Sequence, residues 1–224
     1  MKREIRVFYE NSESGAEKFH LFGGSRMNRA QAVDELKCVY KVLSDDLENA
    51  LQLKREKPTQ FAYRNLFRTY FAYVEGFAFQ LRQVTQASLA ETNFLTDAEL
   101  ALLLEERAQL NNKGEPERKG NYQPFLPNLL FSVRCYAKNH GAIYQPDTSH
   151  NGWESMKKSV AVRDRLTHPK SASGLEVKEE DLECFSAGSE WWKKTLREMF
   201  AACDEADEFY GEQMQAELQN GSGA

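Results

Sequence analysis

The chain has 224 residues, of which 41% are hydrophobic, 28% charged and 12% aromatic, and its formal net charge is −5. This composition excludes a disordered or fibrous protein, and the negative charge argues against a protein that wraps long nucleic acids non-specifically. No apolar stretch reaches the roughly 18 residues that a membrane span needs, and the charged start of the sequence does not suit a signal peptide. We therefore expect a soluble, cytoplasmic protein with no membrane partner.

Residues 1–28 alternate polar and apolar side chains on both sides of a turn at residues 11–15. This pattern predicts a short β-hairpin as an N-terminal extension. Residues 29–218 are predicted to form one helical domain, and residues 219–224 a flexible tail. Within the domain, apolar residues at steps of three and four predict a first helix over residues 29–56, which Pro58 ends.

The second predicted helix covers residues 60–90 and is apolar on nearly all sides. Such a helix must be buried on more than one side, either within its own domain or against another chain, and we favour a subunit interface. Thr96 and Glu99 form a capping box that predicts a third helix ending near Asn112. Residues 113–122 are predicted to be a polar loop.

Two more helices follow, over residues 127–139 and residues 151–168. For the second of these, Asn151 and Glu154 are predicted to form a capping pair at its start. The helix should end before Pro169, because proline disfavours the helical conformation of the residue that precedes it.

A turn at residues 171–177 separates this helix from a long last helix, in which apolar residues recur every three or four positions from Leu182 to Tyr210. Residues 176–217 carry a net charge of −9, which is typical of a solvated helix face. Together these elements predict an all-α antiparallel helical bundle with a short hairpin-like extension at the N-terminus.

Several classes of site are not indicated by the sequence. The four cysteines form no Cys-x-x-Cys pair and have no histidine at ligand spacing, so we expect reduced core thiols and no metal site. The phosphate-binding loop, the dinucleotide-binding glycine motif, the zinc-protease motif and the nucleophile elbow are missing. We expect no cofactor.

Acid–base chemistry near neutral pH requires one of the four histidines unless a carboxylate or lysine is strongly perturbed. His168 stands at the end of the most basic helix, because residues 153–170 carry a net charge of +3. Arg163 precedes His168 by five residues. Arg134 and His140 form a second pair with a similar spacing, which we treat as a chance match.

The segment Val162-Arg-Asp-Arg-Leu-Thr-His-Pro-Lys170 resembles the Arg-polar-x-x-x-His signature of the HEPN superfamily, which are small helical-bundle domains that include many ribonucleases. The turn and the acidic helix start that follow it are similar to the family's pattern, and the aromatic helix from Tyr63 to Gly76 resembles the helix that packs beside the motif. The resemblance covers about residues 30–215. It implies a homodimer in which two motif helices face each other in one cleft.

The resemblance also implies a function, namely metal-independent endoribonuclease activity that leaves a 2′,3′-cyclic phosphate. The family uses such activity in toxin–antitoxin and phage-defence systems, so RNA is the expected substrate and an antitoxin or defence protein an expected partner. The catalytic residues carried over are Arg163, Asp164 and His168.

The chemistry of these three residues is reasonable without the family. Asp164 and His168 are four residues apart on one helical face, so the carboxylate can fix the imidazole tautomer. Arg163 points about 140° away from His168 on an ideal helix and must swing if both are to meet one phosphate. Its guanidinium can bind a phosphate with two hydrogen bonds and stabilise the charge of the transition state.

Four further residues are candidates for substrate contact. Three of them, Arg165, Lys170 and Lys157, supply positive charge around the motif. The fourth is Glu75, which we expect to be buried among aromatic residues of the second helix. Its partner is either a motif arginine or, in a structural role, Arg68 or Arg82.

Two other functions stay open. One is a non-catalytic HEPN-like module that dimerises and binds RNA, a nucleotide or a partner protein. The other is a plain helical interaction protein that uses the acidic last helix as its contact surface. Arg165 and His168 would then only complement the carbonyl groups at the end of their helix.

Overall fold

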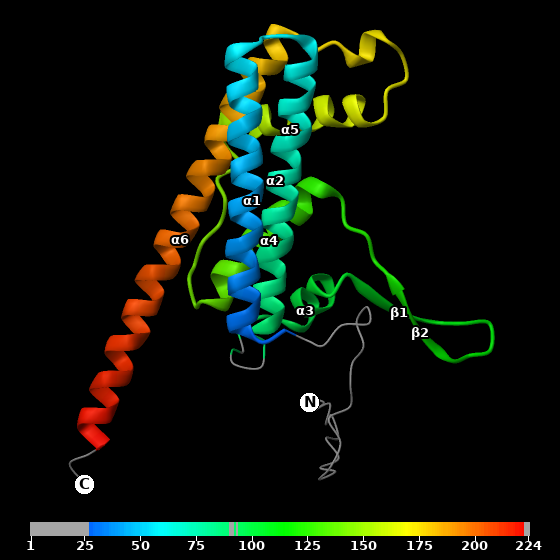
Figure 1. The fold of residues 1–224 in the computed structure, drawn as a ribbon. Helices are drawn as coiled ribbons and strands as arrows, with labels where there is room; N and C mark the ends of the chain where they lie inside the picture. The colour runs from blue at the N-terminus through cyan, green and yellow to red at the C-terminus, as the bar shows by residue number, and fades with distance from the viewer. Residues whose placement is uncertain (1–26, 90–91, 93, 222–224) are drawn as a thin grey trace.

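The computed structural model describes residues 27–221 except residues 90, 91 and 93. These residues form an all-α helical bundle from which a two-stranded hairpin projects, as Figure 1 shows. The hairpin predicted for residues 1–28 lies outside the described residues, apart from residues 27 and 28. The elements in chain order are α1 (Arg29–Glu56), α2 (Gln60–Ala87), α3 (Asp97–Leu103), β1 (Glu106–Leu110), β2 (Pro116–Gly120), α4 (Phe125–Asn139), α5 (Asn151–Thr167), the 3-10 helix η1 (Ser173–Leu175) and α6 (Glu179–Gly221).

Helix α1 has the predicted limits. The Asn28 side chain accepts a hydrogen bond from the Gln31 backbone N–H at 2.9 Å, and the Gln31 side chain accepts one from the Asn28 N–H at 3.0 Å. This capping box satisfies two backbone donors that have no partner within the helix. Pro58 follows the other end, where Lys57 leaves the helical conformation.

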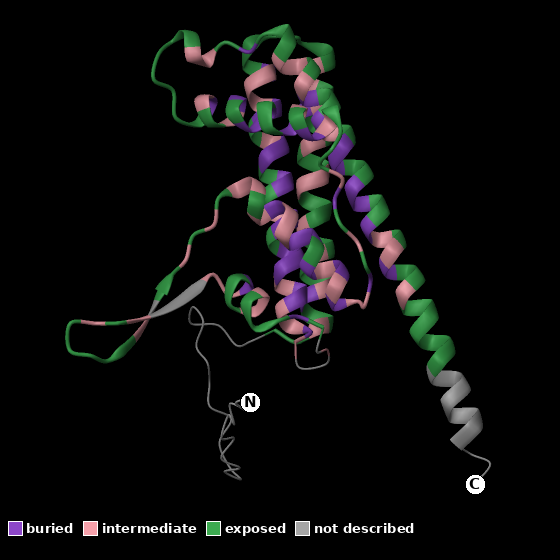
Figure 2. Ribbon diagram, turned by 180° about the vertical axis from the view of Figure 1, so that it is seen from behind, coloured by how far each residue is buried: buried purple, intermediate pink, exposed green. Residues whose placement is uncertain are grey.

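Helix α2 lies at the centre of the fold and packs against α1, α4 and α5. Residues outside its main apolar stripe, such as Leu66, Phe71 and Tyr73, are therefore buried by the chain itself. Figure 2 shows that buried residues are spread along this helix. The subunit interface that the sequence analysis favoured is not needed to bury α2, although Phe61 and Phe79 on it remain exposed.

The region after Thr96 differs from the prediction. Its capping box with Glu99 is present, but α3 ends at Leu103 and does not continue to Asn112. Glu105 adopts a left-handed conformation with a φ of 49°, which no helix can accommodate, and the chain then enters β1.

The predicted polar loop is part of a hairpin. Strand β1 pairs antiparallel with β2, so that Glu106 lies opposite Gly120 and Leu110 opposite Pro116. Between the strands, the N–H of Gly114 donates to the carbonyl of Asn111 at 3.0 Å, and Gly114 has a φ of 78° that glycine adopts without strain.

The start of α5 differs from the prediction. Asn151 is the first residue of α5 and not its cap; the cap position is His150, whose side chain makes no capping hydrogen bond. Helix α6 begins at Glu179, at the predicted acidic helix start, where Asp181 accepts a hydrogen bond from the Lys178 N–H at 2.8 Å. It continues to Gly221, so part of the predicted flexible tail is helical.

The core forms where α2, α5 and α6 meet. The ring of Phe185 on α6 lies 5.1 Å from that of Phe67 and 4.9 Å from that of Tyr70, both on α2. The three tryptophans are buried in the same core. All four cysteines are free, but Cys38 is exposed, so only part of the expected core thiols lie in the core. Within the described residues, no helix is both long and apolar enough to cross a membrane.

Candidate functional site

Arg163, the first residue of the motif, faces the interior of the bundle from α5. Its side chain is 20% exposed, and its guanidinium contacts the carboxylate of Glu75 on α2. Its Nε also lies 3.0 Å from Oδ1 of the neighbouring Asp164. The guanidinium carbon stands 5.3 Å from the ring centre of Phe71 and 4.9 Å from that of Phe125. Two rings and two carboxylates therefore fix the position of this cation.

Glu75 forms its ion pair with the motif arginine Arg163 and not with Arg68 or Arg82. Arg68 donates instead to the carbonyl of Leu166 at 3.1 Å, and Arg82 contacts Glu105. The Glu75 side chain is 43% exposed, so the expectation that it is buried was wrong. It lies at the edge of the aromatic core, where its carboxylate reaches both solvent and Arg163.

The expected contact between Asp164 and His168 is not present. Asp164 is exposed and pairs with Arg163. His168 is the C-cap of α5, with φ −123° and ψ 64°, so it has left the helical path that would place it above Asp164. Its side chain is exposed and makes no hydrogen bond or ion pair within the described part of the chain. The structure thus joins Arg163, Asp164 and Glu75 and leaves His168 apart.

The other three candidates lie in different settings. Arg165 donates to the carbonyls of Gly174 and Glu176 at 2.7 and 2.6 Å and contacts Asp181, so it holds the segment between α5 and α6. Lys157 forms an ion pair with Glu154 at 2.5 Å, one turn earlier on α5. Lys170 is exposed beyond the helix end.

Arg163 also lines a cavity of about 300 Å³ between α2, α4 and the segments that flank the hairpin. We call it the two-arginine pocket because Arg82 lines it as well. Its twelve lining residues are Glu75, Ala78, Phe79, Arg82, Glu105, Tyr122, Gln123, Phe125, Asn128, Leu129, Ser132 and Arg163.

A second ion pair, between Arg82 and Glu105, also lines this pocket. Arg82 is only 9% exposed; its guanidinium contacts Glu105 and lies 5.7 Å from the ring centre of Phe79. Asn128 on α4 donates to Glu105 at 3.1 Å and accepts from Arg82 at 3.4 Å. Arg82, Glu105 and Asn128 were not predicted as site residues, because nothing in their spacing shows that the fold brings these three separate segments together.

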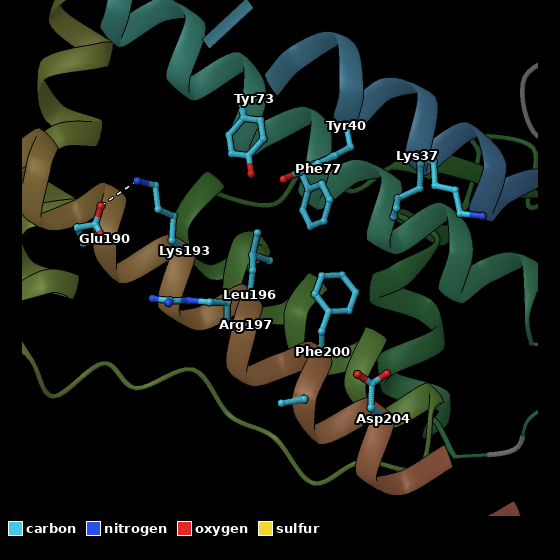
Figure 3. Close-up of a pocket in the computed structure, with 12 residues that line it drawn as sticks. Lys37, Tyr40, Tyr73, Phe77, Glu190, Lys193, Leu196, Arg197, Phe200 and Asp204 are labelled. Atoms are coloured by element: carbon cyan, nitrogen blue, oxygen red, sulfur yellow. Dashed lines mark hydrogen bonds and ion pairs between the residues drawn. The ribbon is translucent and has the colours of Figure 1, made fainter. Parts of the chain in front are cut away.

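A larger cavity lies on another face of the bundle. It is a groove of about 770 Å³ between α1 and α6, with α2 as its floor, and Figure 3 shows the residues that line it. The hydroxyl groups of Tyr40 and Tyr73 point toward each other in this view. Burial and the neighbouring Tyr40 raise the pKa of Tyr73 above its ordinary value, so Tyr73 stays neutral. None of the seven predicted site residues lines this groove.

Two of the cysteines, Cys135 and Cys203, are buried thiols. Burial raises the pKa of Cys135 and that of Cys203 to about 12, so both remain thiols at neutral pH and are poor nucleophiles. Within the described residues, no cluster of three histidine, cysteine or acidic side chains could hold a metal ion.

Comparison with known proteins gives no relative. No family model matches the chain, and neither a curated protein nor a solved structure matches it significantly.

Proposed function

We propose that this chain is a metal-independent endoribonuclease of HEPN type. The observation that carries the proposal is the contrast between two residues of α5. Arg163 is a cation held in place at the wall of a cavity, and His168 is an exposed imidazole without a partner in the described structure. A fixed cation and an available acid–base group on one basic helix are the two parts that phosphodiester cleavage requires.

In the proposed reaction an imidazole removes the proton from the 2′-hydroxyl of RNA, and the alkoxide attacks the adjacent phosphorus. The 5′-oxygen leaves and takes a proton, so the products are a 2′,3′-cyclic phosphate and a 5′-hydroxyl. Arg163 stabilises the additional negative charge on the phosphoryl oxygens. One histidine cannot act as base and acid in the same step, so the proposal includes a two-fold homodimer that supplies two copies of His168.

The ion pairs of Arg163 set a requirement on this mechanism. A phosphate must replace Glu75 or use the guanidinium nitrogens that Glu75 and Asp164 leave free. His168 is not restrained by Asp164 and must be positioned by RNA or by the second copy. A role in a toxin–antitoxin or phage-defence system, with a partner protein, belongs to the same proposal.

The test uses end-labelled tRNA and mixed RNA in excess EDTA. His150→Ala is the matched control for His168→Ala, because His150 is an exposed histidine at the opposite end of α5, paired with Asp147 at 2.8 Å. We expect the unmodified chain and the control to cleave and to leave cyclic phosphate ends, and His168→Ala to leave RNA intact. Intact RNA with the unmodified chain, at a concentration where sedimentation shows a dimer, would refute the nuclease.

A second candidate is a non-catalytic module that binds RNA or a nucleotide. The observation in its favour is that Glu75 and Asp164 already neutralise Arg163. Retained RNA without cleavage, measured by filter binding of the same samples, would select this candidate.

A further inference from the structure

The two-arginine pocket contains a buried cation that the proposed reaction does not use. Arg82 is 9% exposed, and its Nε has no hydrogen-bond partner among the described residues. A buried donor without a partner costs free energy, and a ligand acceptor that reaches it on binding, as the surrounding side chains move, recovers that cost. Glu105 uses only Oε1 for Arg82 and Asn128, so within the described structure its Oε2 is also without a partner.

Glu105 holds this position at a cost in backbone conformation. Its φ of 49° lies in the left-handed region, where a residue with a side chain is strained by about 1 kcal/mol or more. Glycine would take the same turn between α3 and β1 without strain. Strain that places a carboxylate on a pocket wall indicates that the carboxylate has a role there.

The charges of the pocket indicate the class of ligand. Arg82 and Arg163 are balanced by Glu75 and Glu105, so a free phosphate would meet two carboxylates at close range. A neutral group that offers both donors and acceptors suits this lining better. Three aromatic side chains line the same cavity, and two are exposed, Tyr122 by 87% and Phe79 by 46%. Such rings favour a flat ligand that stacks.

We infer that the two-arginine pocket binds a guanine base. On one edge, guanine donates from N1–H and its amino group, which matches the free oxygen of Glu105. On the adjacent edge its O6 and N7 accept two hydrogen bonds from a guanidinium, for which Arg82 has Nε and its second terminal nitrogen, since Glu105 and Asn128 engage only Nη1. Adenine lacks the N1–H and presents a donor where guanine has O6. The inference specifies guanosine as the nucleotide that the proposed nuclease recognises. Binding of guanosine does not depend on the proposed function, and only the expected cleavage next to guanosine rests on it.

Equilibrium dialysis with tritiated guanosine tests the pocket without any cleavage. Adenosine, inosine, 7-deazaguanosine and inorganic phosphate serve as unlabelled competitors. Inosine lacks the amino group that Glu105 would accept from, and 7-deazaguanosine lacks the N7 acceptor. We expect saturable binding of guanosine, weaker competition by inosine and 7-deazaguanosine, and none by adenosine or phosphate.

Two variants locate the binding. Glu105→Gln should weaken guanosine binding by about tenfold, the size of effect expected when a charged hydrogen-bond acceptor is replaced by a neutral amide. Glu154→Gln removes an exposed carboxylate of α5 outside the pocket and should leave binding unchanged. Equal competition by adenosine, displacement by phosphate, or no saturable binding would overturn the inference.

Cleavage data separate this inference from the proposed function. Guanosine binding by a chain that leaves all RNA intact would support the pocket and refute the nuclease. Cleavage without guanosine binding would support the nuclease and refute the pocket. If both hold, mapped cleavage sites should lie next to guanosine.

Discussion

The guanidinium of Arg163 contacts the carboxylate of Glu75 and thereby joins α5 to α2. Arg163 also stacks against Phe71 and Phe125, so it contributes to packing as well as to charge. We predict that Arg163→Ala lowers the free energy of unfolding by about 2 kcal/mol through lost cation–π and ion-pair contacts. Urea denaturation measures the loss.

Asp164→Ala is the control for that prediction, because Asp164 is 61% exposed and pairs with the same guanidinium. Its removal should change stability by about 0.5 kcal/mol or less. Equal stability of Arg163→Ala and the unmodified chain would show that the stacking contributes nothing, and loss of activity in that variant would then be purely functional.

Two glycines of α6 should respond to alanine in opposite directions. A Cβ at Gly188 would stand 3.0 Å from the backbone N and Cα of Met156, so α5 and α6 would have to separate. We expect Gly188→Ala to destabilise the fold by about 1–3 kcal/mol, which outweighs the better helix propensity of alanine. Thermal unfolding followed by circular dichroism measures the change.

Gly211 provides the matched case, since a Cβ there would meet nothing within 4 Å. Gly211→Ala should increase the helix content of the C-terminal part of α6, because alanine favours a helix over glycine by about 1 kcal/mol. A destabilised Gly211→Ala would show that this part of α6 contacts something not seen in a single chain.

The ion pair between Glu99 and Lys138 should make stability depend on pH. Partial burial alone would raise the pKa of Glu99, but hydrogen bonds from Lys138 and Thr96 lower it from 4.5 to about 2. Because the folded pKa is the lower one, Glu99 stabilises the fold above about pH 4.5 and loses this contribution as the pH falls toward 2. We predict that Glu99→Gln costs about 1 kcal/mol at pH 7 and progressively less as the pH falls from 4.5 toward 2.

A double-mutant cycle with Lys138→Gln isolates this term. The coupling energy between the two positions should disappear over the same pH range. A coupling that is unchanged at pH 2 would mean that the Glu99 carboxylate is not the titrating group.

Arg165 should prove to be structural. It donates to two carbonyls and contacts Asp181, and all three partners lie in or after the segment that follows α5. We predict that Arg165→Ala lowers the free energy of unfolding by about 2–3 kcal/mol, because charge-assisted hydrogen bonds are lost. Hydrogen exchange should become faster in residues 169–178 first. Unchanged exchange there, together with weaker RNA binding, would assign Arg165 to the substrate instead.

Most helices could be predicted from the sequence because their signals are local. The limits of α1 depend on Asn28 and on Pro58, and both act within one turn of the residues they affect. The hairpin could not be predicted in this way, since it depends on the left-handed conformation of Glu105, which a glutamate rarely adopts. The Asn111–Gly114 turn was a usable signal for it that the polar composition of the region obscured.

The candidate site shows the same difference between local sequence signals and contacts that depend on tertiary structure. The five-residue spacing of Arg163 and His168 is visible in the sequence, but the partner of Glu75 was one of three arginines until the packing of α2 against α5 was known. Arg82 and Glu105 are 23 residues apart and meet only because the chain turns back after α3. Contacts of this kind depend on tertiary structure, which no local pattern encodes.

The last turns of α6 continue past Tyr210, the ring of which lies 6.1 Å from that of Phe94. Residues 211–213, the last on this helix whose burial is described, are exposed. The bundle nucleates these turns, and their own propensity helps to sustain them. Asp204, Glu208 and Glu212 repel one another at four-residue intervals, and salt screens this repulsion. Ionic strength and temperature should therefore affect the length of α6 in solution. Warming should shorten α6 from its C-terminal turns before the bundle melts.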